Sequence, residues 1–474
     1  MNEKDILEII NNITSSGRDI KARKLSVSGT DIYILFIMHI TDRDSISKNI
    51  IKPILCYKGE DPLNADRIAD SIIYSDDIFM DNKKEDILNS VLDGNTVILV
   101  AGDDNFLKVN TLKVEKRGVE SPELETALRA PRDAFTENLD TNLSLIRYRI
   151  KDPSLCIKYF SIGTRTKTDI ALIYLKDVAN PEYVNKLKKR LSDIQVDGVL
   201  ESGLVQKLIT GDPALFPEMG TLERSDSACS HILDGRVCIV VNGSNLGLVA
   251  PMTFMEFLDS GDDHYNNSYF SIFVKFLRVL ALAITLTLSS FYVAVVAYHP
   301  EVLPSQYILA LASSRIAVPV NAFLEAMLME IVGELLREGS VRLPKQIGPA
   351  ISIVGTIVIG QAAVAAGLVS PLMVIIVALS SMTSFAVPDF TLMNAIRLLK
   401  FMLLIFTGVF GLFGFMMGIN IIAVRIASTT SFGVPYTAPA APFNLRDVMK
   451  FFFSNAMFEK ERASYLKTKD KKRK

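Results

Sequence analysis

Tryptophan is absent from this chain of 474 residues, and cysteine and histidine are scarce. The four cysteines, Cys56, Cys156, Cys229 and Cys238, form no CxxC pair, and the histidines stand at no metal-ligand spacing. This pattern excludes the common zinc and dithiol motifs and indicates reduced core cysteines in a cytosolic compartment. We expect neither a metal nor a cofactor.

Several other signals are also missing. The N-terminus reads MNEKDILEII and lacks the apolar core of a signal peptide, so the first domain is expected to stay on the side where it is made. The net charge of −1 argues against nucleic-acid binding as the main task. No GxSxG, HExxH or Gly-rich phosphate loop occurs, and no catalytic constellation stands out. The sequence therefore does not predict an enzyme.

Charge is unevenly spread, and its scarcity over residues 270–424 marks a membrane region. About 20 apolar residues cross a bilayer. Val279–Tyr298 and Phe401–Val424 each pass this test, and the uncharged stretch between Lys345 and Asp389 is too long for one crossing. Gly367 and Pro371 interrupt that stretch, which predicts a hairpin of two helices. We expect at least four spans; buried helices of a soluble domain are the alternative.

Residues 301–345 are less apolar and include an acidic helix. Glu330, Glu334 and Glu338 follow one another at intervals of four, so they share one helix face. That face is either solvated or forms a vestibule that attracts cations. Pro319 interrupts the preceding helix and is interpreted as a hinge or as a simple corner.

Glycines recur at intervals of three to five in the apolar runs. Gly408, Gly411, Gly414 and Gly418 lie in the last run, and Gly355 and Gly360 lie in the second. Such spacing favours close helix packing in lipid, and flexibility is the alternative, with Gly355 and Gly360 as candidate hinges.

Gln361 is the strongly polar residue in the middle of the second apolar run. It shares a helix face with four apolar residues, so the predicted pore face comprises Val354, Ile357, Val358, Gln361 and Ala365. Around the axis of an oligomer, this face forms a hydrophobic constriction that gates by dewetting. Alternatively, Gln361 bonds a neighbouring helix of the same subunit.

The first half alternates predicted strands and helices and contains two α/β lobes, over residues 1–118 and 119–268. Strands are expected at 31–38, 95–102, 156–163, 169–176, 236–243 and 246–251. Asn180 and Pro181 begin a helix, Lys116–Ser121 links the lobes, and Gly163–Asp169 forms a basic hairpin tip. The fold class is therefore a two-lobed α/β soluble region followed by an all-α polytopic membrane domain over residues 269–426. A solvated, cytoplasmic basic tail follows at 427–474, so the number of spans is even.

Several long motifs resemble the A-subunit family of bacterial spore germination receptors, in the same order along residues 120–445. They include APRDAFTENLDTNLSLIRYRI from Ala130, SIGTRTKTDIALIYLKDVANPEYVNKLKKRL from Ser161, FPEMGTLERSD from Phe216, and SFGVPYTAPAAPF from Ser431. The run from Leu328 to Pro371, which holds the acidic face and Gln361, is also similar. Many family members carry a Trp and an Arg-Pro pair after the last span, whereas this chain has no Trp and has Arg462-Ala463 near that place.

The resemblance implies a subunit of a nutrient receptor in the inner membrane of an endospore. Family A subunits work with a transporter-like B subunit and a lipoprotein C subunit. They are thought to form a ring of like subunits that releases ions from the spore core. An accessory sporulation-stage channel of the same family and a secondary transporter remain alternatives. A membrane-anchored enzyme would need a catalytic set that the sequence does not offer.

Overall fold

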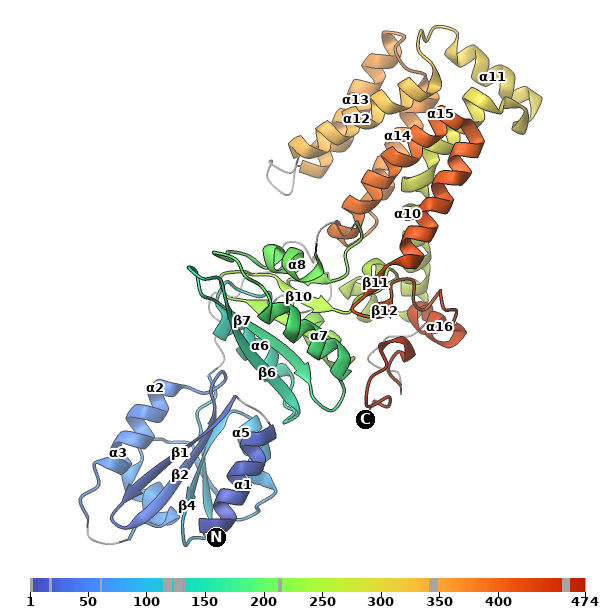
Figure 1. Cartoon of the computed structure of the whole chain (residues 1–474). Coiled ribbons are helices and arrows are strands. Elements are labelled where there is room, and N and C mark those ends of the chain that lie inside the picture. Colours follow the sequence, from blue (N-terminus) through green and yellow to red (C-terminus); the bar gives the residue numbers. More distant parts are fainter. Residues whose placement is uncertain are drawn as a thin grey trace. The chain divides into compact units, whose positions relative to one another are not determined.

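The computed structural model describes residues 3–16, 19–59, 62–113, 122, 131, 133–211, 215–340, 348–453 and 461–473. The chain divides into two compact units (Figure 1). The soluble unit comprises Met1–Asp212, Met219–Pro251 and Glu459–Lys474, and the membrane unit comprises Pro213–Glu218 and Met252–Phe458. The first is α/β and the second mainly helical, which confirms the predicted fold class. The predicted lobe linker, Lys116–Ser121, lies outside the described residues.

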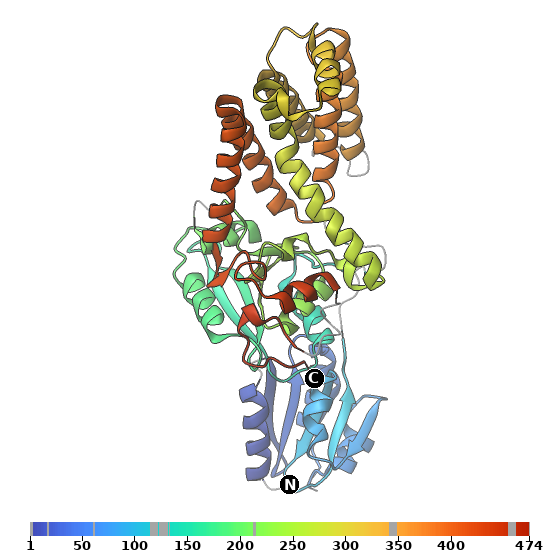
Figure 2. The same cartoon turned by 90° about the vertical axis from the view of Figure 1, so that its right-hand side faces the viewer.

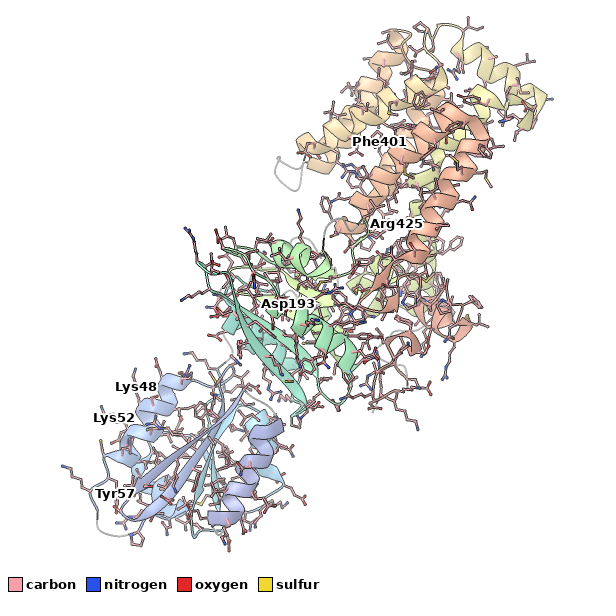
Figure 3. All side chains as sticks on the ribbon, in the orientation of Figure 1. Lys48, Lys52, Tyr57, Asp193, Phe401 and Arg425 are labelled. Atoms are coloured by element: carbon pink, nitrogen blue, oxygen red, sulfur yellow. The ribbon has the colours of Figure 1, made fainter. Side chains whose placement is uncertain are left out.

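The first lobe of the soluble unit has an antiparallel sheet in the order β1-β2-β4-β5-β3. Alternation along β2 sends Ile32 and Ile34 into one core and Tyr33 and Leu35 into the other, so helices cover both faces. Its elements are β1 Ile20–Val27, β2 Thr30–Ile37, β3 Ile78–Asp81, β4 Asn95–Val100, β5 Phe106–Asn110, α1 Glu3–Ser16, α2 Arg43–Ser45, α3 Lys52–Leu55, α4 Ala65–Arg67 and α5 Asp86–Leu92, with π-helical turns at Ile46–Ile51 and Ile68–Ile72. Figure 3 labels Lys48 in the π-helical turn before α3, Lys52 at the start of α3 and Tyr57 just after its end.

The second lobe repeats the strand order of the first. Its antiparallel sheet has the order β6-β7-β9-β10-β8. Strands β6 to β10 thus occupy the same positions in this sheet as β1 to β5 do in the first. Its elements are β6 Leu155–Ile162, β7 Thr168–Leu175, β8 Gly220–Leu222, β9 Val237–Val241, β10 Gly247–Ala250, α6 Leu139–Arg149, α7 Pro181–Ser192, α8 Ser202–Thr210 and α9 Ser225–Leu233. The soluble unit is thus built from one topology used twice.

All six predicted strands are present, and the predicted α7 is confirmed. The Asn180 side chain accepts a hydrogen bond from the Glu182 amide at 2.9 Å, as expected of a helix cap before Pro181. The basic hairpin tip is also confirmed, because β6 ends at Ile162 and β7 begins at Thr168.

The end of the chain is folded onto the second lobe, whereas the sequence predicted a solvated tail. Arg462 donates to the Leu233 carbonyl at 2.8 Å, and the Lys469 amide donates to the Val178 carbonyl at 3.0 Å. Arg473 pairs with Asp234. The prediction failed because it read the positive charges as solvated, whereas backbone carbonyls and a carboxylate of the lobe bind them. A short 3₁₀ turn, Ser464–Leu466, lies within this segment.

The membrane unit holds the long apolar helices. Its elements are α10 Ser268–Val293, α11 Ser305–Arg315, α12 Ala322–Ser340, α13 Gly348–Ala365, α14 Pro371–Ser384, α15 Phe390–Ser428 and α16 Leu445–Phe453, with β11 Thr430–Ser431, β12 Val434–Pro435, 3₁₀ turns at Glu256–Leu258, Gly261–His264 and Pro300–Val302, and a π-helical turn at Ala294–Tyr298. By length and composition alone, two described helices could span a membrane, Ser268–Tyr298 and Phe390–Ser428. Each contains an 18-residue window with a mean hydropathy of 2.2, although the second is interrupted at Gly411. Val354–Ala365 and Pro371–Ser384 are shorter apolar helices.

The helix α15 is a hairpin of two arms rather than the single span predicted over Phe401–Val424. Gly411 has φ 61° and ψ −139°, which breaks the helix, and Figure 2 shows two arms leaving the turn. A Cβ built at Gly418 would lie 3.8 Å from the Leu403 Cα, so the arms run side by side. Figure 3 labels Phe401 on the first arm and Arg425 on the second. The sequence analysis interpreted Gly411 as a packing residue or a point of flexibility within one span, and not as the turn between two arms.

Candidate functional site

Helices α13 and α14 form the hairpin that the sequence predicted. Gly367 has φ 69° after the end of α13, and the Leu368 amide donates back to the Ala363 carbonyl at 2.8 Å, which closes the helix as a C-terminal glycine does. Ser370 then caps α14, and Pro371 occupies its first position. The two breakers in the sequence therefore set the length of α13 and place it against α14.

The predicted pore face is the exposed side of α13. Val354 and Val358 are 57% and 56% exposed, and Ile357 is 38% exposed. Gln361 and Ala365 are exposed as well. The opposite side of the helix buries Thr356 and Gly360. The described chain thus leaves one apolar stripe of α13 uncovered, and that stripe carries Gln361.

Gln361 lines an open groove of about 670 Å³ between α13 and α14. Apart from the Gln361 amide, the lining is hydrocarbon: Ile357, Val364, Ala365, Pro371, Val374, Ile375, Ala378, Leu379 and Met382. Within the described part of the chain, no residue hydrogen-bonds the Gln361 amide. An amide in an apolar surrounding loses several kcal/mol when it has no hydrogen-bond partner. The groove therefore places an unsatisfied polar group on an apolar surface.

The candidate hinge residues occupy packed or connecting positions. A Cβ at Gly355 would lie 3.3 Å from the Leu336 side chain of α12, and one at Gly360 would lie 2.6 Å from Val374 of α14. Both glycines let α13 approach its neighbours closely. Pro319 lies in the connection between α11 and α12. A hinge role for these three residues stays a prediction.

The acidic face of α12 is turned toward cations of the same chain. Glu330 is 2% exposed and pairs with Lys400 of α15, which is 4% exposed. Ser289 of α10 donates a hydrogen bond to Glu330 at 2.5 Å, and Ser380 of α14 lies 3.4 Å from the Lys400 amine. The Glu330 carboxylate is therefore neutralised by Lys400 and hydrogen-bonded inside the membrane unit.

Glu334 continues this pairing one turn further along α12. The Arg397 Nε donates to Glu334 Oε1 at 3.1 Å, and a second guanidinium nitrogen also contacts the carboxylate. Two acids of α12 that stand four residues apart thus form ion pairs with two cations that stand three residues apart on the first arm of α15. This arm runs antiparallel to α12. Glu338 is exposed near the end of α12.

The sequence analysis missed a second buried acid, Glu325, at the other end of α12. It is fully buried, lies 3.3 Å from Arg315, and accepts a hydrogen bond from the Ser370 amide at 2.6 Å. It ties α11, α12 and α14 together. We call Glu325, Glu330, Glu334, Arg315, Arg397 and Lys400 the charged cluster of α12. The signal that could have found it is the presence of ionisable residues at helix spacing inside apolar runs.

The described residues hold no group of three or more His, Cys, Asp or Glu side chains that could bind a metal ion. The acids and cations of the charged cluster of α12 pair with one another. The arrangement suits a polar interior that holds helices together, beside an uncovered apolar helix face.

Comparison with known proteins places the whole chain in one family. A family model described as Bacillus/Clostridium GerA spore germination protein matches residues 8–465. The chain is 36% identical over 455 residues to Spore germination protein KA of Bacillus subtilis (strain 168), which spans 95% of this chain and 84% of that protein. It is 33% identical over 472 residues to Spore germination protein GerLA of Bacillus cereus, which spans 98% and 96% of the two chains.

Among solved structures, the chain is similar to the N-terminal domain of the A subunit of the Bacillus megaterium spore germinant receptor GerK3. The identity is 26% and the TM-score 0.39, over 53% of this chain and 96% of that one. The family model and both germination proteins cover nearly all of the sequence, the soluble lobes and the apolar helices alike. The chain therefore belongs to the GerA family of spore germination proteins.

Proposed function

We propose that this chain is the A subunit of a nutrient germinant receptor and that copies of it form a gated ion channel. The role in spore germination follows from its family. In the proposed assembly, the exposed faces of α13 surround one axis. Val354, Ile357 and Val358 form a hydrophobic constriction, with Gln361 as a polar ring below or above it.

One observation carries the proposal: the Gln361 amide is exposed on α13 without a partner in its own described chain. Hydrocarbon would leave this amide unsatisfied, at a cost of several kcal/mol. Water in a pore, or the same residue of a second copy, would satisfy it. An apolar stripe alone would fit lipid equally well, so the amide is what favours an axis between copies.

The proposed setting is the spore inner membrane, with the soluble unit and the tail on the cytoplasmic side. The proposed partners are a transporter-like B subunit and a lipoprotein C subunit, as the family resemblance implies. The soluble unit, which has no apolar helix of spanning length in its described part, would be free to contact such partners or to relay their state to the membrane unit.

Shortening the pore face tests the proposal directly. Val354→Ala and Val358→Ala remove apolar atoms from every subunit of a ring at once, so the constriction becomes wider and easier to wet. We expect spores with either change to germinate without nutrient, and the reconstituted protein to leak ions from vesicles.

Ile359→Ala is the matched control, because Ile359 lies on the same helix, is 40% exposed, and points away from the pore face. It should leave spores dormant. If all three variants keep dormancy and the nutrient response at normal protein levels, α13 does not line a pore.

A secondary transporter is the second candidate, because the charged cluster of α12 places ionisable residues inside the membrane unit. The same vesicles separate the two functions. Ion flux without a counter-substrate supports the channel, whereas saturable solute exchange supports the transporter.

A further inference from the structure

The helix α16 is amphipathic, and its apolar side is the side left uncovered. Leu445 and Met449 are 62% and 46% exposed, and Phe443, just before the helix, is 71% exposed. The one acidic residue of the helix, Asp447, is only 4% exposed and lies 3.4 Å from the Lys450 amine. A helix on the surface of a water-soluble domain has the opposite arrangement, with charges outward and apolar residues inward.

Contacts with α10 hold α16 in this orientation. Lys275 of α10 is 4% exposed, and its amine donates to the Phe451 carbonyl at 2.9 Å. The same amine lies 4.7 Å from the centre of the Phe451 ring and 3.0 Å from Asp259. A buried cation thus binds the inner side of α16, so its Leu445 and Met449 side is turned away from the protein.

The first turns of α10 also expose large apolar side chains. Phe270, Phe273 and Phe276 are 56%, 58% and 59% exposed, and Leu280 is 45% exposed. Phe273, Phe276 and Leu280 share one helix face, and exposed Phe291 continues that face into the span. The uncovered face of α10 therefore stays apolar from the start of the helix into the part that is apolar enough to cross a membrane.

The charges at this level are neutralised by partners of the same chain. Arg278 forms an ion pair with Asp263, and Lys275 pairs with Asp259. These pairs let the start of α10 lie at the depth of lipid headgroups without an unpaired buried charge. Arg446 is exposed beside the apolar side of α16, and a cation at such a position suits anionic lipid phosphates.

We propose that α16 and the first turns of α10 form a membrane-surface anchor that seats between the headgroups and acyl chains of the bilayer. The occupant is lipid rather than protein because the exposed apolar face of α10 continues along a helix long and apolar enough to span a membrane, and α16 is held against the start of that helix. Phenyl rings at the start of a span and a cation beside the apolar side are typical of interfacial segments. At nine residues, α16 is about 13 Å long and suits a helix lying in the membrane plane.

The absence of Trp from the chain makes a direct test possible. Leu445→Trp and Met449→Trp each introduce a single tryptophan on the apolar side of α16. The full-length protein is reconstituted in vesicles of phosphatidylcholine and phosphatidylglycerol, with or without brominated acyl chains. We expect brominated lipid to lower the Trp emission at both positions at least two-fold, and iodide in the buffer to have little effect.

Tyr74→Trp is the control, because Tyr74 lies in the first lobe and is 72% exposed. It should be quenched by iodide and not by brominated lipid. If both α16 tryptophans behave like the Tyr74 control, the anchor is wrong and this side of α16 faces water. If neither quencher reaches them, a protein covers the surface and the lipid anchor is equally wrong. The test uses no ion flux, so its failure would leave the channel proposal standing.

Discussion

At the scale of single residues, the buried ion pairs of α12 decide how the membrane unit holds together. Helices in lipid gain little from the hydrophobic effect, so polar contacts and close packing must supply their association. Glu330 and Lys400 come from different helices and are both almost fully buried. A buried ion pair gains little net free energy over a well-packed apolar pair. We therefore expect this pair to specify how α12 packs against α15 rather than to add much stability.

Removing only one partner of a buried ion pair costs more free energy than the intact pair gains. Lys400→Met leaves the Glu330 carboxylate buried without its cation, and we expect a loss of about 3–5 kcal/mol of stability. The double variant Glu330→Gln with Lys400→Met removes both charges and should recover most of that loss. Thermal unfolding in detergent and the amount of folded protein measure both effects.

Arg425→Met is the matched control, since Arg425 lies in the last turn of α15 and is exposed. It should leave the unfolding temperature unchanged. A double variant that is no more stable than Lys400→Met alone would show that the two groups do not act as a pair.

At the scale of elements, the sequence predicted the turns and helix ends that are set by residues close together in the chain. Gly367 and Pro371 gave the hairpin of α13 and α14, and Asn180 with Pro181 gave the start of α7. The edge strand β1 was missed because its central residues are charged and exposed, with no apolar alternation to read. The exposed stripe of α13 that carries Gln361 was predicted from its helical period, and its role in a pore stays a prediction. The cations that pair with α12 were not found, because helices distant in sequence bring them together.

The turn at Gly411 leads to a prediction about α15. Its φ and ψ lie in a region that is open essentially only to glycine, and a Cβ there would also lie 2.8 Å from the Tyr298 ring. Gly411→Ala should therefore cost about 1–3 kcal/mol in backbone strain, and lower the unfolding temperature and the protein level. Gly339→Ala is the control, because α12 leaves open space there.

Cross-linking gives the hairpin an independent readout. Cysteines placed at Leu403 and Gly418 should form a disulfide, because the two arms are in contact at these positions. In one continuous helix these positions would stand roughly 22 Å apart. A pair that never cross-links, together with a normal Gly411→Ala protein, would contradict the turn.

At the scale of the whole molecule, the folded tail restricts the topology of the membrane unit. The chain leaves the soluble unit at Pro251 and belongs to it again at residues 461–473, where Arg462 and Lys469 bind the second lobe. Because a folded lobe stays on one side of a membrane, we expect both ends of the membrane unit to emerge on that side. An even number of crossings would follow, however the individual apolar helices are counted.

Thiol labelling tests both the parity and the side. Cys56 is exposed, whereas burial raises the pKa of Cys238 to about 12 and also raises that of Cys229, so both buried thiols react slowly near neutral pH. An impermeant maleimide should label Cys56 in inside-out vesicles and not in right-side-out vesicles. Lys472→Cys in a Cys56→Ser, Cys156→Ser background reports on the exposed tail and should give the same pattern.

Labelling of the two positions from opposite faces would mean an odd number of crossings and a tail that leaves the second lobe. Labelling of both from the outer face would keep the parity and reverse the proposed orientation.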